Sequence, residues 1–293
     1  MSDCTPPVTA VRKAVDRALD EDLTPLGDLS SAVLDHDTEA TAAFVAREAG
    51  RLSGTACATE TFRAVDASIA VEWQLCDGDE VHPGATLGTV TGRLAPILTA
   101  ERTALNFLGH LSGIATLTAQ YVAAASAAGS AKVWDTRKTT PGLRALEKAA
   151  VRAGGGRNHR GNLSDWVLLK DNHLAGLGIS EAVRRCRDAW PGRTVHVECD
   201  RLDQMVEAIS AGADAVLLDN MAPDLVRACV ERADALAAGG RRALLEVSGG
   251  VTLDTIGDYS ATGIDLISIG RLTNSAPVLD VGLDISDLLE GRG

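Results

Sequence analysis

Residues 194–220 read TVHVECDRLDQMVEAISAGADAVLLDN, and they place a strand, a helix and a second strand in succession. The runs at 194–200 and 214–220 are mostly apolar, which is typical of strands buried on both faces of a sheet. Between them, residues 202–212 repeat apolar side chains at helical spacing. A strand, a helix and a parallel strand make one βαβ unit, so this stretch predicts a parallel sheet covered by helices.

The same alternation continues on both sides of this unit. Six strand-helix units in succession favour a closed parallel barrel over an open doubly wound sheet. The further strands are predicted at 131–136, 165–171, 243–250 and 264–271, and the further helices at 142–154, 180–190 and 222–239.

The sequence before about residue 113 has a different pattern. It begins with an amphipathic helical stretch at 8–22. Strand-like stretches follow at 39–54 and 68–94, and the second is broken by Asp-Gly and Pro-Gly turns. We therefore predict an α+β region at the N-terminus, followed by an α/β region.

Composition limits the classes of function. The chain has 293 residues, 45% of them hydrophobic, which is enough for a sizeable core. A net charge of -12 argues against nucleic acid or an anionic membrane surface as the main partner. No apolar run approaches the ~18 residues that span a bilayer, and the N-terminal residues show no apolar signal core. The six cysteines include no C-x-x-C pair, which argues against a zinc site or disulfide framework. We expect a cytoplasmic protein with reduced thiols.

Each predicted strand of the α/β region ends in polar or charged residues. In a parallel barrel the carboxyl ends of all strands open onto one face, where the active site lies. We therefore expect these residues to line one pocket, although polar strand ends are also common on exposed surfaces. The residues are Asp135, Thr136, Arg137, Lys138, Lys170, Asp171, Asn172, Glu198, Asp219, Asn220, Ser248, Gly249, Gly250, Gly270 and Arg271.

Two features of this face predict anion binding. The last two strands end in small residues at 248–250 and 270–271, which let backbone N–H groups approach a phosphate, although Gly-Gly is also common in turns. The glycine-rich segment at 153–165 carries His159 and Arg160. It is either a surface loop or an arm that binds an anion, since arginine suits bidentate contacts to carboxylate or phosphate. The other histidines show no metal-ligand spacing, so no histidine is predicted as a metal ligand.

A helical pattern at 98–113 carries Arg102 within an apolar stripe. In the ordinary interpretation, the Arg102 side chain extends along the helix to water. In the alternative, the stripe packs on another subunit and Arg102 reaches into that subunit's site.

Several motifs together resemble those of the quinolinate phosphoribosyltransferase family, the decarboxylating nicotinate-nucleotide pyrophosphorylases of NAD biosynthesis. The resemblance covers about residues 20–285, and its DTRKTTPG and KDNH motifs are specific to this family and a few close relatives. The motifs are LTAERTALNFLGHLSGIAT, DTRKTTPGLRALEKAAVRAGGGRNHR, LLKDNH, VHVECD, LLDN, EVSGGV and LTNSAPVLDVGLDI.

The resemblance implies a type II phosphoribosyltransferase fold. An α+β, sandwich-like N-terminal domain is expected at 1–112, with the tail at 275–293 returning to it. An incomplete parallel α/β barrel is expected at 113–274. The resemblance also implies a homodimer, or a higher oligomer, whose active sites are shared between subunits.

The family chemistry joins quinolinate to 5-phosphoribosyl-1-pyrophosphate with Mg²⁺, and it gives nicotinate mononucleotide, pyrophosphate and CO₂. Both substrates are polyanions, which explains local cations in an acidic protein. By resemblance, quinolinate is bound by Thr136, Arg137, His159, Arg160 and Lys170, with Arg102 of the partner subunit. The donor's phosphates are bound by Lys138, Ser248, Gly249, Gly250, Gly270, Arg271 and Asn274. The expected catalytic residues are Lys138, Glu198 and Asp219, the two carboxylates also being the Mg²⁺ ligands.

The sequence departs from the family pattern at Asn274, where histidine is expected, at Arg271, where a small residue is more usual, and at 109–110. These changes bear on substrate affinity rather than on the type of reaction. Three other functions stay open. A paralogous transferase would use another acceptor, a phosphate-binding barrel lyase would use Lys170 as a Schiff-base amine, and a metabolite sensor would bind the donor without turnover.

Overall fold

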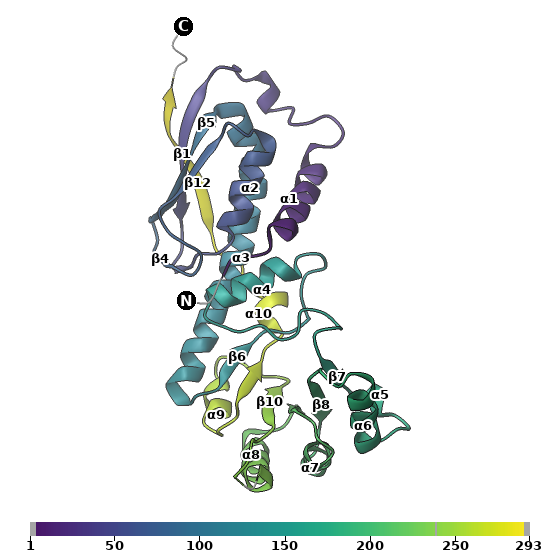
Figure 1. Cartoon of the computed structure of the whole chain (residues 1–293). Helices are drawn as coiled ribbons and strands as arrows, with labels where there is room; N and C mark the ends of the chain where they lie inside the picture. The colour runs from purple at the N-terminus through teal and green to yellow at the C-terminus, as the bar shows by residue number, and fades with distance from the viewer. Residues whose placement is uncertain (1–3, 238, 290–293) are drawn as a thin grey trace. The chain divides into compact units, whose positions relative to one another are not determined.

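A four-stranded antiparallel sheet and a six-stranded parallel sheet organise the chain (Figure 1). The structure, a computed structural model, describes residues 4–237 and 239–289, so the predicted domain ends at 1–3 and 290–293 lie outside the described residues. One unit, the sheet unit, comprises the described parts of Met1–Ala119, Thr139–Gly155 and Arg271–Gly293. The other, the barrel unit, comprises the described parts of Gln120–Lys138 and Gly156–Gly270.

The sheet unit is built on a four-stranded antiparallel sheet in the order β12-β1-β5-β3. The strand β12, last in the chain, pairs along β1 and so returns the C-terminal segment to the N-terminal sheet. A separate two-stranded ladder joins β2 to β4. The strands are β1 (Glu39–Ala46), β2 (Gly50–Arg51), β3 (Ala70–Trp73), β4 (Glu80–Val81), β5 (Thr86–Arg93) and β12 (Val281–Leu289).

The core of the sheet unit joins this sheet to two helices, α2 (Thr55–Val65) and α3 (Leu94–Ala128). Alternate residues of β1 are buried, as expected for a strand with one face on a core. The Phe44 ring stacks on Trp73 with centroids 4.8 Å apart and meets Phe62 edge-on at 5.8 Å. This packing fixes the register of β1, because a slip of one residue would turn its buried side chains outward.

The helix predicted at 98–113 is part of α3, which spans 35 residues and passes from the sheet unit into the barrel unit. It extends further because good helix formers, mainly alanine, continue to Ala128 before Gly129. The other helical elements of the sheet unit are α1 (Val8–Leu23), a 3₁₀ turn (Ser31–Val33), α4 (Arg144–Ala153) and α10 (Arg271–Asn274).

The barrel unit contains the six predicted strands, all paired in parallel in the order β6-β11-β10-β9-β8-β7. The strands are β6 (Lys132–Trp134), β7 (Val167–Leu169), β8 (Val195–Cys199), β9 (Ala215–Asp219), β10 (Leu244–Ser248) and β11 (Leu266–Ser268). The helices are α5 (Asp171–Leu174), α6 (Ile179–Ala189), α7 (Leu202–Ser210), α8 (Pro223–Ala237) and α9 (Ile256–Ser260). The α/β fold class is confirmed.

The expectation of a closed barrel is wrong. Strands β6 and β7 are the two ends of the sheet, and no ladder joins them within the described residues. The reason lies in the segment after α4, where Arg157 forms a parallel bridge with Trp134. The Arg157 N–H donates to the Val133 carbonyl at 2.9 Å, and the Asp135 N–H donates to the Arg157 carbonyl at 3.0 Å. These bonds occupy the edge of β6, so the barrel is incomplete, as the family resemblance implies.

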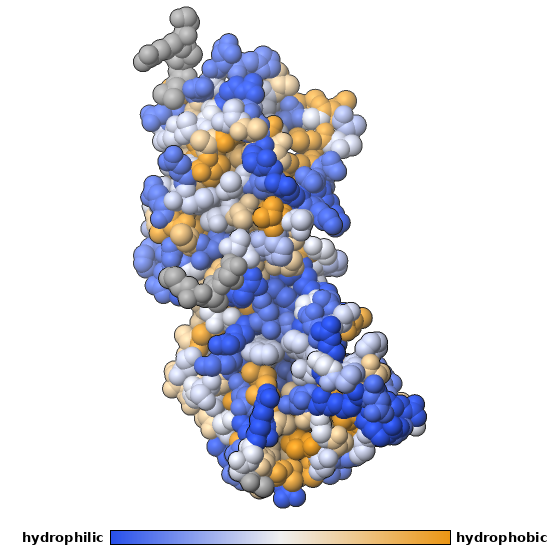
Figure 2. Space-filling model, in the orientation of Figure 1, coloured by the Kyte–Doolittle hydropathy of each residue, from blue (hydrophilic) through white to orange (hydrophobic). Residues whose placement is uncertain are grey.

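Apolar side chains are scattered among polar ones on the molecular face in Figure 2. Within residues 4–237 and 239–289, no helix combines the length and the hydropathy that crossing a bilayer requires.

Candidate active site

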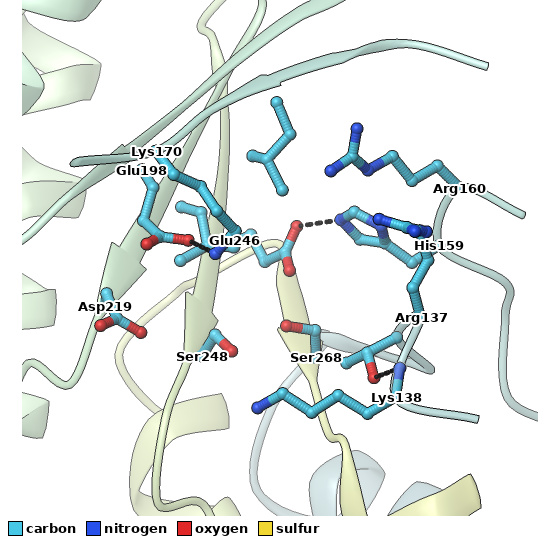
Figure 3. Close-up of a pocket in the computed structure, with 13 residues that line it drawn as sticks. Arg137, Lys138, His159, Arg160, Lys170, Glu198, Asp219, Glu246, Ser248 and Ser268 are labelled. Carbon is cyan, nitrogen blue, oxygen red and sulfur yellow. Dashed lines mark hydrogen bonds and ion pairs between the residues drawn. The ribbon is translucent and has the colours of Figure 1, made fainter. Parts of the chain in front are cut away.

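One cavity of about 330 Å³ lies at the carboxyl ends of the parallel strands, and its lining comes entirely from the barrel unit (Figure 3). The structure therefore brings together nine of the predicted site residues. They are Thr136, Arg137, Lys138, His159, Arg160, Lys170, Glu198, Asp219 and Ser248. The other lining residues are Leu168, Leu217, Glu246 and Ser268.

Strand geometry explains this convergence, because residues two apart on a strand point to the same face. Leu217 and Asp219 on β9, and Glu246 and Ser248 on β10, form two such pairs in the lining. The register places Leu217 beside Glu246 and Asp219 beside Ser248. The cavity thus has a deeper layer from mid-strand positions and an outer layer from strand ends, as in other parallel barrels.

Arg137, His159 and Arg160 form one side of the cavity, and Lys170 and Glu198 lie on the opposite side (Figure 3). Arg160 is only 8% exposed, and its Nη1 donates to the Trp166 carbonyl at 3.3 Å. Burial lowers the pKa of Arg160, and the nearby positive charge of Arg137 lowers it further. Two guanidinium groups held this close favour binding of an anion, which would relieve their repulsion.

Asp135 fixes the segment that carries His159. It is fully buried, and its carboxylate accepts from the His159 N–H at 2.8 Å and from Asn158 Nδ2 at 2.6 Å. The His159 ring lies 4.9 Å from Trp166 and 5.8 Å from Trp134, measured between centroids. Hydrogen bonds to the main chain and aromatic packing of the ring therefore hold this imidazole in the cavity wall.

Two carboxylates stand on neighbouring strands at the outer layer. Glu198, at the end of β8, forms a close ion pair with the Nζ of Lys170. Asp219, at the end of β9, accepts from Asn220 Nδ2 at 2.7 Å. Asn220 has a positive φ of 54°, a conformation that asparagine tolerates better than most residues. The strand ends thus combine cationic and anionic groups around one space.

The backbone after β10 turns sharply at the glycine pair. Gly249 has φ +97°, and a Cβ there would lie 2.1 Å from Asn220 Oδ1. Gly250 has φ +63° and open space where its Cβ would be. At Gly270 a Cβ would lie 2.9 Å from Lys138 Cδ. Left-handed backbone or close approach favours glycine at these positions, and left-handed turns of this kind can present main-chain N–H groups to an anion.

Two family models match the sequence. The model described as "Quinolinate phosphoribosyl transferase, N-terminal domain" matches residues 28–112, and its C-terminal counterpart matches residues 114–284. The chain belongs to the quinolinate phosphoribosyltransferase family. The resemblance found from the sequence motifs is therefore confirmed.

Relatives of this quinolinate phosphoribosyltransferase chain align over nearly its whole length. A Mycobacterium leprae protein named "Nicotinate-nucleotide pyrophosphorylase [carboxylating]" is 41% identical over 291 residues, 97% of this chain and 100% of the relative. A Bacillus subtilis protein named as a probable enzyme of the same kind is 40% identical over 263 residues, 89% and 88% of the two chains. The solved nicotinate-nucleotide pyrophosphorylase of Francisella tularensis is 36% identical, with a TM-score of 0.91 and coverage of 96% and 98%.

Three residues predicted for the phosphoribosyltransferase site belong to the sheet unit. Arg102 lies on α3, and Arg271 and Asn274 lie on α10. All three are exposed, and Asn274 Oδ1 accepts from the Ser275 hydroxyl at 2.7 Å. Their assignment to the acceptor and donor sites stays a prediction.

Sequence reasoning missed Glu246, Ser268 and His196 in this quinolinate phosphoribosyltransferase. Glu246 and Ser268 line the cavity, and His196 Nε2 lies 3.6 Å from Glu246 Oε2. The available signal was alternation, because His196 and Glu246 each stand two residues before a predicted site residue on the same strand. A charged or titratable residue in the middle of a buried parallel strand is uncommon and indicates such a position.

Proposed function

We propose that the chain transfers the phosphoribosyl group of 5-phosphoribosyl-1-pyrophosphate to quinolinate and releases pyrophosphate and CO₂, giving nicotinate mononucleotide for NAD biosynthesis. One observation carries the proposal. A protein of net charge -12 gathers Arg137, Lys138, Arg160 and Lys170 around a single cavity of about 330 Å³. That volume lies in the range of small-molecule sites, and the charge suits two polyanionic substrates.

The acceptor is assigned to the side of the cavity formed by Arg137, His159 and Arg160. Quinolinate carries two adjacent carboxylates on a planar ring, and guanidinium groups bind such groups in bidentate fashion. Thr136 and Lys170 lie on the same cavity lining and complete the proposed set. Fixing both carboxylates would orient the ring nitrogen toward the donor, which removes much of the entropic cost of the encounter.

The donor is assigned to Lys138 and to the glycine turns after β10 and β11. Lys138 lies against Gly270, and Ser248 lies in the same lining as Lys138. The N–H groups of Gly249 and Gly250 are proposed to bind the 5-phosphate, because left-handed turns present successive N–H groups to anions. Arg271 and Asn274 are proposed to add contacts at this end.

Glu198 and Asp219 are proposed to hold Mg²⁺. Their carboxylates end adjacent strands and line the same cavity, and Mg²⁺ prefers oxygen ligands of this kind while keeping several waters. When bound, the ion would neutralise charge on the departing pyrophosphate. The ion pair of Glu198 with Lys170 also keeps a cation beside this pair of acids.

Side chains of the cavity are proposed to stabilise the charges that develop in turn during the reaction. As pyrophosphate leaves, the ribose C1 becomes positively charged, and the carboxylates of Glu198 and Asp219 stabilise that charge while Lys138 holds the leaving anion. The ring nitrogen of quinolinate then bonds to C1 and becomes cationic. The electron pair of the C2–carboxylate bond stays on C2 as CO₂ departs, where the adjacent cationic nitrogen stabilises it, and C2 then takes a proton from water. No general acid or base from the protein is required for this step.

We further propose a homodimer in which Arg102 of the partner subunit completes each acceptor site. Arg102 is exposed on α3 although residues 103–105 beside it are buried. The family resemblance is the basis for proposing that the active site is shared between subunits. A cytoplasmic location is also proposed, supported by all six cysteines being free thiols.

A panel of acceptors tests the proposal. The purified protein is incubated with Mg²⁺, the phosphoribosyl donor and either quinolinate, nicotinate or nicotinamide, and nucleotide products are separated by chromatography. We expect nicotinate mononucleotide from quinolinate only. Efficient product formation from another acceptor, with none from quinolinate, would favour the paralogue. A borohydride-trapped adduct at Lys170 would favour the lyase, although Glu198 already engages that amine.

A further inference from the structure

A buried carboxylate with two imidazoles lies in the deeper layer of the cavity. Glu246 on β10 has no solvent exposure, and His159 and His196 are 7% and 2% exposed. The Nε2 atom of His159 lies 3.3 Å from Glu246 Oε2, and that of His196 lies 3.6 Å from the same oxygen. Figure 3 shows the Glu246 carboxylate directed at His159 from the cavity floor.

A carboxylate in this position needs compensation, because burying an unpaired charge is very costly. Burial raises the pKa of Glu246, whereas hydrogen bonds from His159 and Ser268 and the attraction of a protonated imidazole lower it, and the net shift of its pKa is downward. The group therefore stays ionised. Burial lowers the pKa of His196 to about 4, so His196 is neutral near pH 7. It contributes to the trio as a neutral polar ring whose Nε2 lies 3.6 Å from the carboxylate.

The geometry makes His159 the partner that connects Glu246 to the acceptor side of the cavity. His159 and Glu246 both line the cavity, whereas His196 packs behind them with its ring 6.0 Å from that of His159. Asp135 holds the His159 main chain, and Trp166 packs on its ring. Glu246 is the acidic group placed to accept from the ring itself, and such a contact fixes ring orientation and which nitrogen carries hydrogen.

We propose that Glu246 is a positioning residue for the acceptor: its buried carboxylate holds the His159 imidazole in a fixed orientation beside Arg137 and Arg160, and His196 restrains that carboxylate from behind. The inference rests on the proposed function, since the acceptor is the quinolinate dicarboxylate. It predicts that a negative charge within the cavity improves the binding of an anion, which is opposite in sign to simple Coulomb repulsion.

The test compares steady-state constants of the full-length enzyme and its Glu246→Gln variant. Glutamine keeps the shape but loses the charge, so we expect the KM for quinolinate to rise about tenfold or more. The KM for the phosphoribosyl donor should stay within about twofold, because the donor is assigned to other residues. Glu246→Asp, which keeps the charge, should recover part of the loss.

The matched control is Asp214→Asn. Asp214 accepts from the Val195 N–H at 2.7 Å and pairs with Arg187 at the amino end of the same sheet. This substitution removes a carboxylate charge from the same unit, but at the opposite end of the strands from the cavity. Both KM values should therefore stay unchanged. If Glu246→Gln does not fold, His196→Gln replaces it, with the same selective rise expected at smaller size.

Several results would overturn the inference. They are an unchanged or lower quinolinate KM in Glu246→Gln, an equal rise in both KM values, or the absence of any effect in His196→Gln. Stoichiometric zinc in the purified wild-type enzyme that Glu246→Gln loses would also overturn it, because the ligand atoms of the trio lie within 4.8 Å of one another and would then be a metal site. Wild-type protein that does not convert quinolinate would instead contradict the proposed function.

Discussion

The Asp135 carboxylate accepts a hydrogen bond from the His159 N–H at 2.8 Å, although the two residues lie 24 positions apart. The contact joins the segment after β6, which carries Arg137 and Lys138, to the glycine-rich segment that carries Arg160. A buried carboxylate thus determines how the cationic side of the cavity is assembled.

We predict that Asp135→Asn weakens both stability and acceptor binding. An amide has one acceptor oxygen for the two donors that Asp135 now satisfies, so the free energy of unfolding should fall by about 2 kcal/mol. Quinolinate KM should rise more than donor KM because His159 and Arg160 lose their support. Chemical denaturation and steady-state kinetics check this, with Asp214→Asn as the control. A variant with wild-type quinolinate KM would refute the role.

Arg137→Ala should weaken the binding of quinolinate much more than the binding of the donor. Removing a charge-assisted partner that ligand binding buries costs about 2–5 kcal/mol of binding, and we expect that loss for quinolinate and little loss for the donor. Isothermal titration with each ligand measures the difference. Arg184→Ala serves as control, because Arg184 is an exposed arginine paired with Glu181 and Asp188 on α6, where ion pairs contribute little. Equal losses for both ligands would count against the assignment.

Gly249→Ala should impair donor binding specifically. The substitution places a methyl group 2.1 Å from Asn220 Oδ1 and forces a left-handed φ of +97° on alanine. Gly212→Ala is the matched control, with φ +93° and nothing within 4 Å of its Cβ. Gly212→Ala should lose about 1 kcal/mol of stability to backbone strain, and Gly249→Ala should lose more because of its close contact with Asn220. Only Gly249→Ala should raise the donor KM, by about tenfold or more if phosphate contacts are lost. Equal donor KM values in the two variants would contradict the proposed role of the Gly249 turn in binding the donor's phosphate.

Arg102→Ala and Lys170→Ala should complement each other if sites are shared between subunits. Each variant alone is expected to be nearly inactive, since each lacks a cation from every acceptor site. In a mixed dimer, one of the two sites regains both side chains, so up to about a quarter of wild-type activity should return after random subunit exchange. Mixing each variant with itself is the control. Verified exchange without recovery would contradict the shared site.

Much of the fold followed from local pattern. Strands such as 214–220 were predictable because a continuous apolar run ending in Asp219 and Asn220 fits a buried parallel strand and little else. The open side of the barrel could not be predicted from local pattern, because it depends on the pairing of Arg157 with Trp134, a contact between two segments that are separate in the sequence.

The site residues also fall into some that the sequence could predict and some that it could not. Lys170 and Glu198 could be predicted from their places at strand ends, since all such ends meet on one face. Glu246 and His196 were missed because the prediction considered only the strand ends, although both stand two residues before a predicted site residue; their contact at 3.6 Å shows the cluster. For Arg102 the helical pattern left two alternatives open, and the family resemblance favoured the one in which its target lies on another subunit.

The most direct test of the central claim uses quinolinate labelled isotopically in its C2 carboxyl group, incubated with the protein, Mg²⁺ and the phosphoribosyl donor. Labelled CO₂ and nicotinate mononucleotide should appear in equal amounts, only when the donor is present, and Arg160→Ala should abolish both. Nucleotide that retains the label, or CO₂ released without the donor, would contradict this account of the cavity's chemistry.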